Sequence, residues 1–117
     1  MGAISTTLLA LCRPSGAHVV AQRQIFGQTY TMLERILPPY GVETTFVRGS
    51  DPGAFRAAMR PSTKLVYIET PSNPMLQIVD ISAIAAVAHQ GGVPLVVDGT
   101  LASPMLQQPL ALGADLV

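Results

Sequence analysis

The chain has 117 residues, of which 49% are apolar and only 12% are charged, and its seven basic residues balance its seven acidic ones. This composition excludes an intrinsically disordered chain, which combines low hydropathy with high net charge. It also lacks the basic footprint of a nucleic-acid-binding domain. The length allows one domain at most. A small domain has a large surface to cover. Because so few residues are charged, we expect that something else covers much of this surface.

Cys12 is the single cysteine and lies in an apolar run, so we expect a buried structural thiol rather than a disulfide or a cysteine-rich metal site. No apolar stretch approaches the ~18 residues of a membrane span. The first residues lack the basic region of a signal peptide. We therefore expect a cytoplasmic protein with neither a membrane nor a nucleic acid as its partner.

Apolar periodicity and chain-breaking residues predict strands that alternate with helices. The expected helices are 3–12, 28–37, 52–59 and 81–89, with Asp51 and Asp80 as N-caps of the last two. The expected strands are 18–21, 42–47, 64–69 and 94–98, with the start of another at 115–117. Near-continuous apolar strands between helices predict an α/β fold with a mostly parallel sheet. Because this pattern starts and stops in mid-architecture, we expect residues 1–117 to be a slice of a larger domain, truncated at both ends.

In parallel sheets, functional groups collect beyond the carboxyl ends of the strands. In this chain those positions lie in the segments 24–27, 69–73 and 98–104. They offer one aromatic side chain, one amide and one carboxylate that we expect to converge on one edge of the sheet: Phe26, Asn73 and Asp98.

Each of these residues has a functional and a purely structural interpretation. Asp98 directly follows an apolar strand, and a partly buried carboxylate needs a partner such as the protonated ring nitrogen of a cofactor. Alternatively, it caps the following turn through the amide of Thr100 or Leu101. Asn73 either donates to a ligand oxygen or only shapes its turn. Phe26 either stacks on a planar ring or belongs to the core.

The remaining chemistry-bearing residues indicate no second site. His18 and His89 are far apart in the sequence and have no other metal-ligand types around them, so we expect both to be structural and predict no metal site. The sequence contains no GxGxxG, GxxxxGK[ST] or GxSxG motif, which disfavours a nucleotide-binding domain and an α/β-hydrolase.

Five short segments, which occur in order, match a known pattern. They are MGAIS at 1–5, IFGQT at 25–29, ETPSNP at 69–74, VVDGT at 96–100 and QQPLALGAD at 107–115. Together they resemble the Cys/Met-metabolism family of pyridoxal-phosphate (PLP) enzymes, and the resemblance covers the whole chain. The family includes cystathionine γ-synthase, the cystathionine lyases, methionine γ-lyase and the homoserine-ester sulfhydrylases.

The resemblance implies the large domain of an aspartate-aminotransferase-like (fold type I) enzyme with pyridoxal 5′-phosphate as cofactor. Met1 and Gly2 resemble the helix start whose backbone amides hold the cofactor phosphate. Phe26 stands where many members stack a tyrosine on the pyridine ring. Asn73 resembles the residue that hydrogen-bonds the 3-oxygen of the cofactor, and Asp98 the carboxylate that pairs with the pyridine nitrogen.

The same resemblance implies that no catalytic residue is present in this chain. In the family, the lysine that holds the cofactor follows the Leu-Gly-Ala-Asp segment within a Ser-Ala-Thr-Lys motif, which would lie beyond Val117. Lys64 is the one lysine here, and we expect it to be a solvated charge at the start of a strand. The resemblance also implies that the C-terminal small domain is absent from residues 1–117. We therefore expect residues 1–117 to be inactive alone.

For the complete enzyme, the resemblance implies γ-replacement or γ-elimination on an amino acid: a homoserine ester, cystathionine or methionine. It also implies a homo-oligomer, namely a tetramer. The alternative function is a non-catalytic module that binds PLP or another anion, or that pairs with a related full-length subunit.

Overall fold

The computed structural model describes residues 1–13 and 16–117. Its strands are β1 (Ala17–Gln22), β2 (Val42–Val47), β3 (Thr63–Glu69) and β4 (Leu95–Asp98). Its α-helices are α1 (Gly2–Leu11), α2 (Gly27–Thr31), α3 (Pro52–Ala58), α4 (Ile81–Gln90) and α5 (Ser103–Leu106). A π-helical turn at Met32–Ile36 and two 3-10 turns at Pro38–Tyr40 and Pro109–Leu112 complete the order. This arrangement confirms the expected α/β class.

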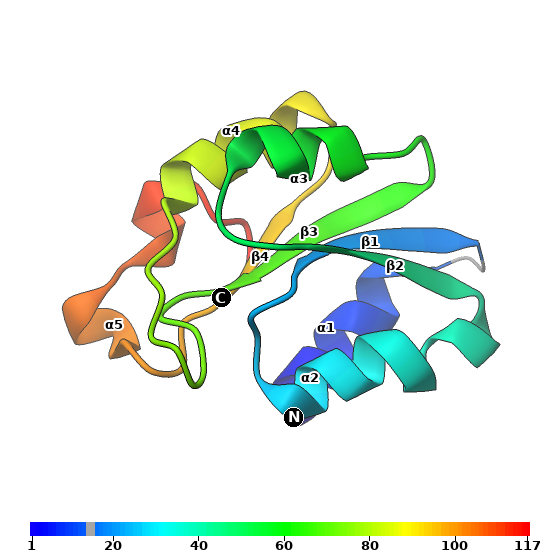
Figure 1. The fold of residues 1–117 in the computed structure, drawn as a ribbon, viewed down its shortest axis with the longest axis horizontal. Coiled ribbons are helices and arrows are strands. Elements are labelled where there is room, and N and C mark those ends of the chain that lie inside the picture. The colour runs from blue at the N-terminus through cyan, green and yellow to red at the C-terminus, as the bar shows by residue number, and fades with distance from the viewer. Residues whose placement is uncertain (14–15) are drawn as a thin grey trace.

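The strands of the described residues form one sheet in the order β2-β1-β3-β4, and each neighbouring pair is parallel. Helices α1 and α2 cover one face of the sheet, and α3 and α4 cover the other (Figure 1). Beyond β4, Leu116 forms an isolated parallel bridge with Val96, in line with the strand start expected at 115–117. All carboxyl ends therefore lie at the same edge, where Glu69 and Asp98 are register partners.

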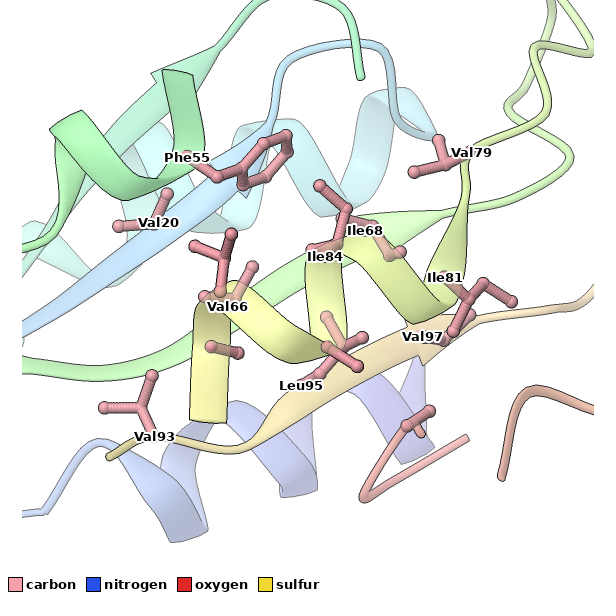
Figure 2. Packing of buried hydrophobic residues seen from close by; sticks show 14 of the residues in the cluster. Val20, Phe55, Val66, Ile68, Val79, Ile81, Ile84, Val93, Leu95 and Val97 are labelled. Atoms are coloured by element: carbon pink, nitrogen blue, oxygen red, sulfur yellow. The ribbon is translucent and has the colours of Figure 1, made fainter. Parts of the chain in front are cut away.

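Successive side chains on a strand point to opposite sides of the sheet. Because the strands carry apolar residues at successive positions, both faces of the sheet are apolar. On β3, Val66 and Ile68 pack in the cluster with α3 and α4, whereas Leu65 and Tyr67 pack in the cluster with α1 and α2. In the first of these clusters, Phe55 lies over the central strands (Figure 2). Burial on both sides explains why the strands read as near-continuous apolar runs.

The predicted N-caps are confirmed. The Asp51 carboxylate accepts hydrogen bonds from the amides of Gly53 and Ala54, at 3.2 and 3.1 Å. The Asp80 carboxylate accepts one from the amide of Ala83 at 3.0 Å. These contacts satisfy amides that the first turn of a helix leaves free.

The helix predicted at 28–37 is different in the structure. It is an α-helix only through Thr31 and continues as a π-turn, in which the amide of Leu37 donates to the carbonyl of Met32 at 2.9 Å. Apolar periodicity over a single turn does not distinguish the two helix types. Helix α5 and the turn Pro109–Leu112 were not predicted at all, because each is only four residues long.

Helix α1 lies within one residue of its predicted bounds. Cys12, which follows it, is buried and unpaired as expected, and burial raises the pKa of its thiol. We expect the chain-breaking residues at 13–16 to end this helix, and two of them, residues 14 and 15, lie outside the described residues. Across residues 1–13 and 16–117, none of the helices combines the length and the apolar character needed to cross a membrane.

Removal of the Phe55 side chain tests the packing between the sheet and the helices α3 and α4. Phe55 is fully buried, so we expect Phe55→Ala to lower the free energy of unfolding by about 3–5 kcal/mol. Leu106, which is 84% exposed, supplies the control, since Leu106→Ala should cost no more than about 0.5 kcal/mol. Urea unfolding measures both changes, and equal losses would contradict the packing described here.

Candidate cofactor site

The carboxyl edge of the sheet and the first turn of α1 surround a cavity of about 300 Å³. Its lining residues are Met1, Ile4, Phe26, Glu69, Asn73, Asp98, Thr100 and Leu101. A second cavity of about 500 Å³ shares Met1, Ile4, Asp98 and Thr100 with the first and extends to Ser103 and Val117. The structure thus brings together four of the five residues singled out in the sequence: Met1, Phe26, Asn73 and Asp98. Gly2 begins α1 but lines neither cavity.

Asp98 is held from both sides by hydrogen bonds. Its Oδ1 accepts the backbone amide of Thr100 at 3.0 Å and also the Thr100 hydroxyl, so Asp98 caps the following turn while it also lines the cavity. Its Oδ2 accepts the hydroxyl of Tyr67 at 3.2 Å. Among the residues that the structure describes, no basic side chain forms a salt bridge with Asp98. The half-buried carboxylate is therefore oriented but not neutralised.

Tyr67 is a residue of this site that the sequence analysis missed. It lies on β3, next to β4, and its ring is buried between the sheet and α1 and α2. Burial, and then the charge of Asp98, raise the pKa of the phenol above its ordinary value. The hydroxyl therefore stays protonated near neutral pH and remains a donor. Only the strand register reveals this contact, because 31 residues separate the pair.

The Glu69 carboxylate forms hydrogen bonds with two loops at this edge, one after β1 and one after β3. Its Oε2 accepts the backbone amide of Phe26 at 2.7 Å, and its Oε1 accepts the backbone amide of Asn73 at 2.6 Å. The amide of Glu69 itself donates to Oε1 of Gln22, at the end of β1, at 3.1 Å. The sequence predicts that Glu69 lies at this edge but assigns it no role. The structure shows that one buried carboxylate ties the loop after β1 to the loop after β3.

The surroundings of Glu69 favour its protonated form more than water favours that of an ordinary glutamic acid. Burial raises the pKa of Glu69 most, because the ionised form loses its hydration. The amides of Phe26 and Asn73 act in the opposite direction, and the charge of Asp98 raises the pKa further. The net shift is upward. Two carboxyl groups thus lie close together at one edge of the sheet.

Phe26 is not a core residue, since it is 40% exposed and lines the cavity at the start of α2.

Asn73 lies in a loop that is shaped by two buried hydroxyls. The Thr70 hydroxyl accepts the amide of Val79, and the Ser72 hydroxyl accepts the amide of Gln77, each at 3.1 Å.

The first turn of α1 supplies the remaining wall of the cavity. Met1 is the N-cap residue, and no side chain of residues 1–13 and 16–117 caps the helix. The Ser5 hydroxyl and amide both donate to the Met1 carbonyl, at 2.9 Å. The amides at the start of a helix carry a partial positive charge and have no partner within it. This turn can therefore bind an anionic group.

The two histidines lie outside the cavity and have structural partners. The His18 ring contacts the hydroxyl of Thr63 through Nδ1 at 2.8 Å and that of Thr45 through Nε2 at 2.9 Å. Burial is the largest cause that lowers the pKa of His18. The His89 ring contacts the Asp115 carboxylate at 2.9 Å. Each ring thus has a polar partner within the fold.

Lys64 is remote from the site. It is exposed near the amino end of β3, whereas Asn73 follows the carboxyl end of that strand. Its predicted place at a strand start is confirmed. In the part of the chain that the structure covers, no group of three or more histidine, cysteine, aspartate and glutamate side chains is arranged to hold a metal ion.

Comparison with known proteins gives the family. The model of the "Cys/Met metabolism PLP-dependent enzyme" family matches residues 1–117. The chain belongs to this family. The resemblance seen in the sequence is therefore confirmed, and the cofactor of the family is PLP.

Individual relatives agree with the family. The chain is 43% identical over 117 residues to an O-succinylhomoserine sulfhydrylase from Pseudomonas aeruginosa, covering all of this chain and 29% of the relative. It is 44% identical over 118 residues to an L-methionine γ-lyase from Porphyromonas gingivalis, again covering all of this chain and 29% of the relative. The solved O-acetylhomoserine sulfhydrylase of Wolinella succinogenes matches with a TM-score of 0.92 at 42% identity, over 99% of this chain and 33% of that one. The chain thus spans about a third of the length of these relatives.

The titration of Glu69 tests the electrostatics of the site. We expect its side-chain carbon resonance in NMR to titrate with a midpoint above the ordinary value of 4.5. Because the folded-state pKa is raised, the contribution of protonated Glu69 to stability is full below that ordinary value. It is lost as the pH rises through the folded midpoint. Glu69→Gln should remove this titration step, and a midpoint at or below 4.5 would contradict the account.

Proposed function

We propose that residues 1–117 form the cofactor-binding half of a PLP site, within an enzyme that acts at the γ-carbon of an amino acid. The substrate would be a homoserine ester, cystathionine or methionine, and the reaction a γ-replacement or γ-elimination. The observation that carries this proposal is the cavity in which α1, Phe26, Asn73 and Asp98 meet, in a chain that matches the family over its whole length.

The charge of Asp98 fits the cofactor. A half-buried carboxylate with no basic partner among the described residues favours a cationic group beside it, and a protonated pyridine nitrogen is such a group. The hydrogen bonds from Tyr67 and Thr100 fix the orientation of the carboxylate. Asp98 would therefore hold a proton on the ring nitrogen. With its ring protonated, bound PLP withdraws electrons from the substrate and makes its α-proton easier to remove.

The other lining residues have matching roles. Phe26 presents an exposed aromatic face on which a planar ring can stack. The Asn73 amide group would donate to the 3-oxygen of the cofactor. The uncapped first turn of α1, at Met1 and Gly2, would hold the phosphate through its backbone amides.

We further propose that these 117 residues bind the cofactor without turning over a substrate. Covalent capture of PLP requires a lysine amine. Lys64, the one lysine in the sequence, lies at the opposite end of β3 from Asn73. The lysine and the group that grips the substrate carboxylate would come from other parts of the full enzyme. We propose a homo-oligomer as its assembled form.

The affinity for PLP tests the role of Asp98. We expect the chain to bind PLP, as measured by fluorescence titration, and Asp98→Asn to weaken binding by at least about tenfold. The reason is that a hydrogen bond to a charged group contributes about 1.5–3 kcal/mol, and about 1.4 kcal/mol is tenfold. Asp51→Asn is the matched control, because asparagine and aspartate cap a helix about equally well. Equal affinities of all three proteins would contradict the role of Asp98.

The phosphate site is tested by a change of ligand, because backbone amides cannot be substituted. We expect pyridoxal, which lacks the phosphate, to bind at least about tenfold more weakly than PLP. Inorganic phosphate should compete with PLP and not with pyridoxal. Equal affinity for PLP and pyridoxal would remove the first turn of α1 from the site.

A further inference from the structure

We propose that Glu69 is a positioning residue for the cofactor: its two carboxylate oxygens hold Phe26 and Asn73 at fixed places relative to Asp98. This inference rests on the function proposed above. It adds a residue that contacts neither the phosphate turn nor Asp98 by a hydrogen bond, yet fixes two of the groups that would contact the ring.

The first support is that both oxygens of one carboxylate are used. Oε2 accepts the Phe26 amide at 2.7 Å, and Oε1 accepts the Asn73 amide at 2.6 Å. An ionised carboxylate accepts at both oxygens, whereas glutamine accepts at one and donates at the other. Glutamine in this place would turn its amino group toward one of the two N–H donors. The geometry therefore requires the carboxylate and not merely a polar side chain of the same size.

The second support is that Glu69 is itself fixed from both neighbouring strands. Its backbone amide donates to Oε1 of Gln22 on β1, at 3.1 Å. On the other side, Asp98 of β4 is its register partner, and the amide of Thr70 donates to the Asp98 carbonyl at 3.1 Å. The carboxylate thus starts from a backbone that is locked to the strand of Asp98. Its hydrogen bonds to the Phe26 and Asn73 amides therefore hold the loops after β1 and β3 at fixed positions relative to Asp98.

The third support is that burying an ionised Glu69 beside Asp98 lowers the stability of the fold. Glu69 is 3% exposed and lies near the charge of Asp98, and burial of an ionised carboxyl group beside another is unfavourable. A neutral residue would avoid that cost if packing were its only task. Alignment of Phe26 and Asn73 is a task that the charged form performs and a neutral one does not.

The test compares Glu69→Gln with Glu43→Gln, the same change at an exposed residue on β2 that pairs with Arg60. Amide hydrogen exchange, followed by NMR, should accelerate at least about tenfold at Phe26 or Asn73 in Glu69→Gln. The affinity for PLP should fall at least about tenfold in the same variant. Glu43→Gln should leave both measurements unchanged.

The possible results separate this inference from the proposed function. If the unsubstituted chain does not bind PLP, the proposed function fails, and the positioning role fails with it. If the unsubstituted chain binds PLP and Glu69→Gln binds it equally well, only the positioning role of Glu69 is overturned. Unchanged exchange at both Phe26 and Asn73 would overturn it as well.

A second measurement needs no variant, in case Glu69→Gln does not fold. In the unsubstituted chain, the amide resonances of Phe26 and Asn73 should shift together on acidification. Both should follow the titration of the Glu69 carboxyl group, with one common midpoint. Separate midpoints, or no shift at either amide, would show that one carboxylate does not hold both loops.

Discussion

The register of the parallel sheet is the constraint on which the site depends. Because β1, β3 and β4 run in the same direction, their carboxyl ends meet at one edge, and Glu69 and Asp98 become neighbours across 29 residues of sequence. A slip of one residue in β3 would turn Glu69 to the opposite face of the sheet, and the same slip in β4 would turn Asp98 away. The apolar layers on the two faces oppose that slip, since Val66 and Leu65 pack in different clusters. The core thereby fixes the positions of the polar residues.

The site concentrates negative charge that the fold itself does not neutralise. Asp98 has three hydrogen-bond donors around it and no basic partner in residues 1–13 and 16–117. Glu69 lies beside it with a raised pKa. Such an arrangement adds little to stability, and it favours a cationic ring between the exposed face of Phe26 and the two carboxyl groups. In the proposed function, the cofactor supplies that positive charge and the first turn of α1 binds the anionic end.

The sequence predicts the strands and the place of Asp98 because both depend on local patterns. An apolar run ends in a carboxylate, and strands that alternate with helices imply a parallel sheet whose carboxyl ends meet. The contact of Tyr67 with Asp98 and that of Glu69 with Phe26 are not predictable in this way, because the partners lie 31 and 43 residues apart in the chain. The π-turn after Thr31 and helix α5 were missed since each spans about one turn, too short for a periodic signal.

Amide chemical-shift changes on addition of PLP would show whether the cofactor binds at the carboxyl edge of this sheet. We expect changes in the first turn of α1, at Phe26, at Asn73 and at Thr100, with none around His18. Changes centred on Lys64 and the opposite end of the sheet would contradict binding at this edge, as would a spectrum that PLP leaves unchanged.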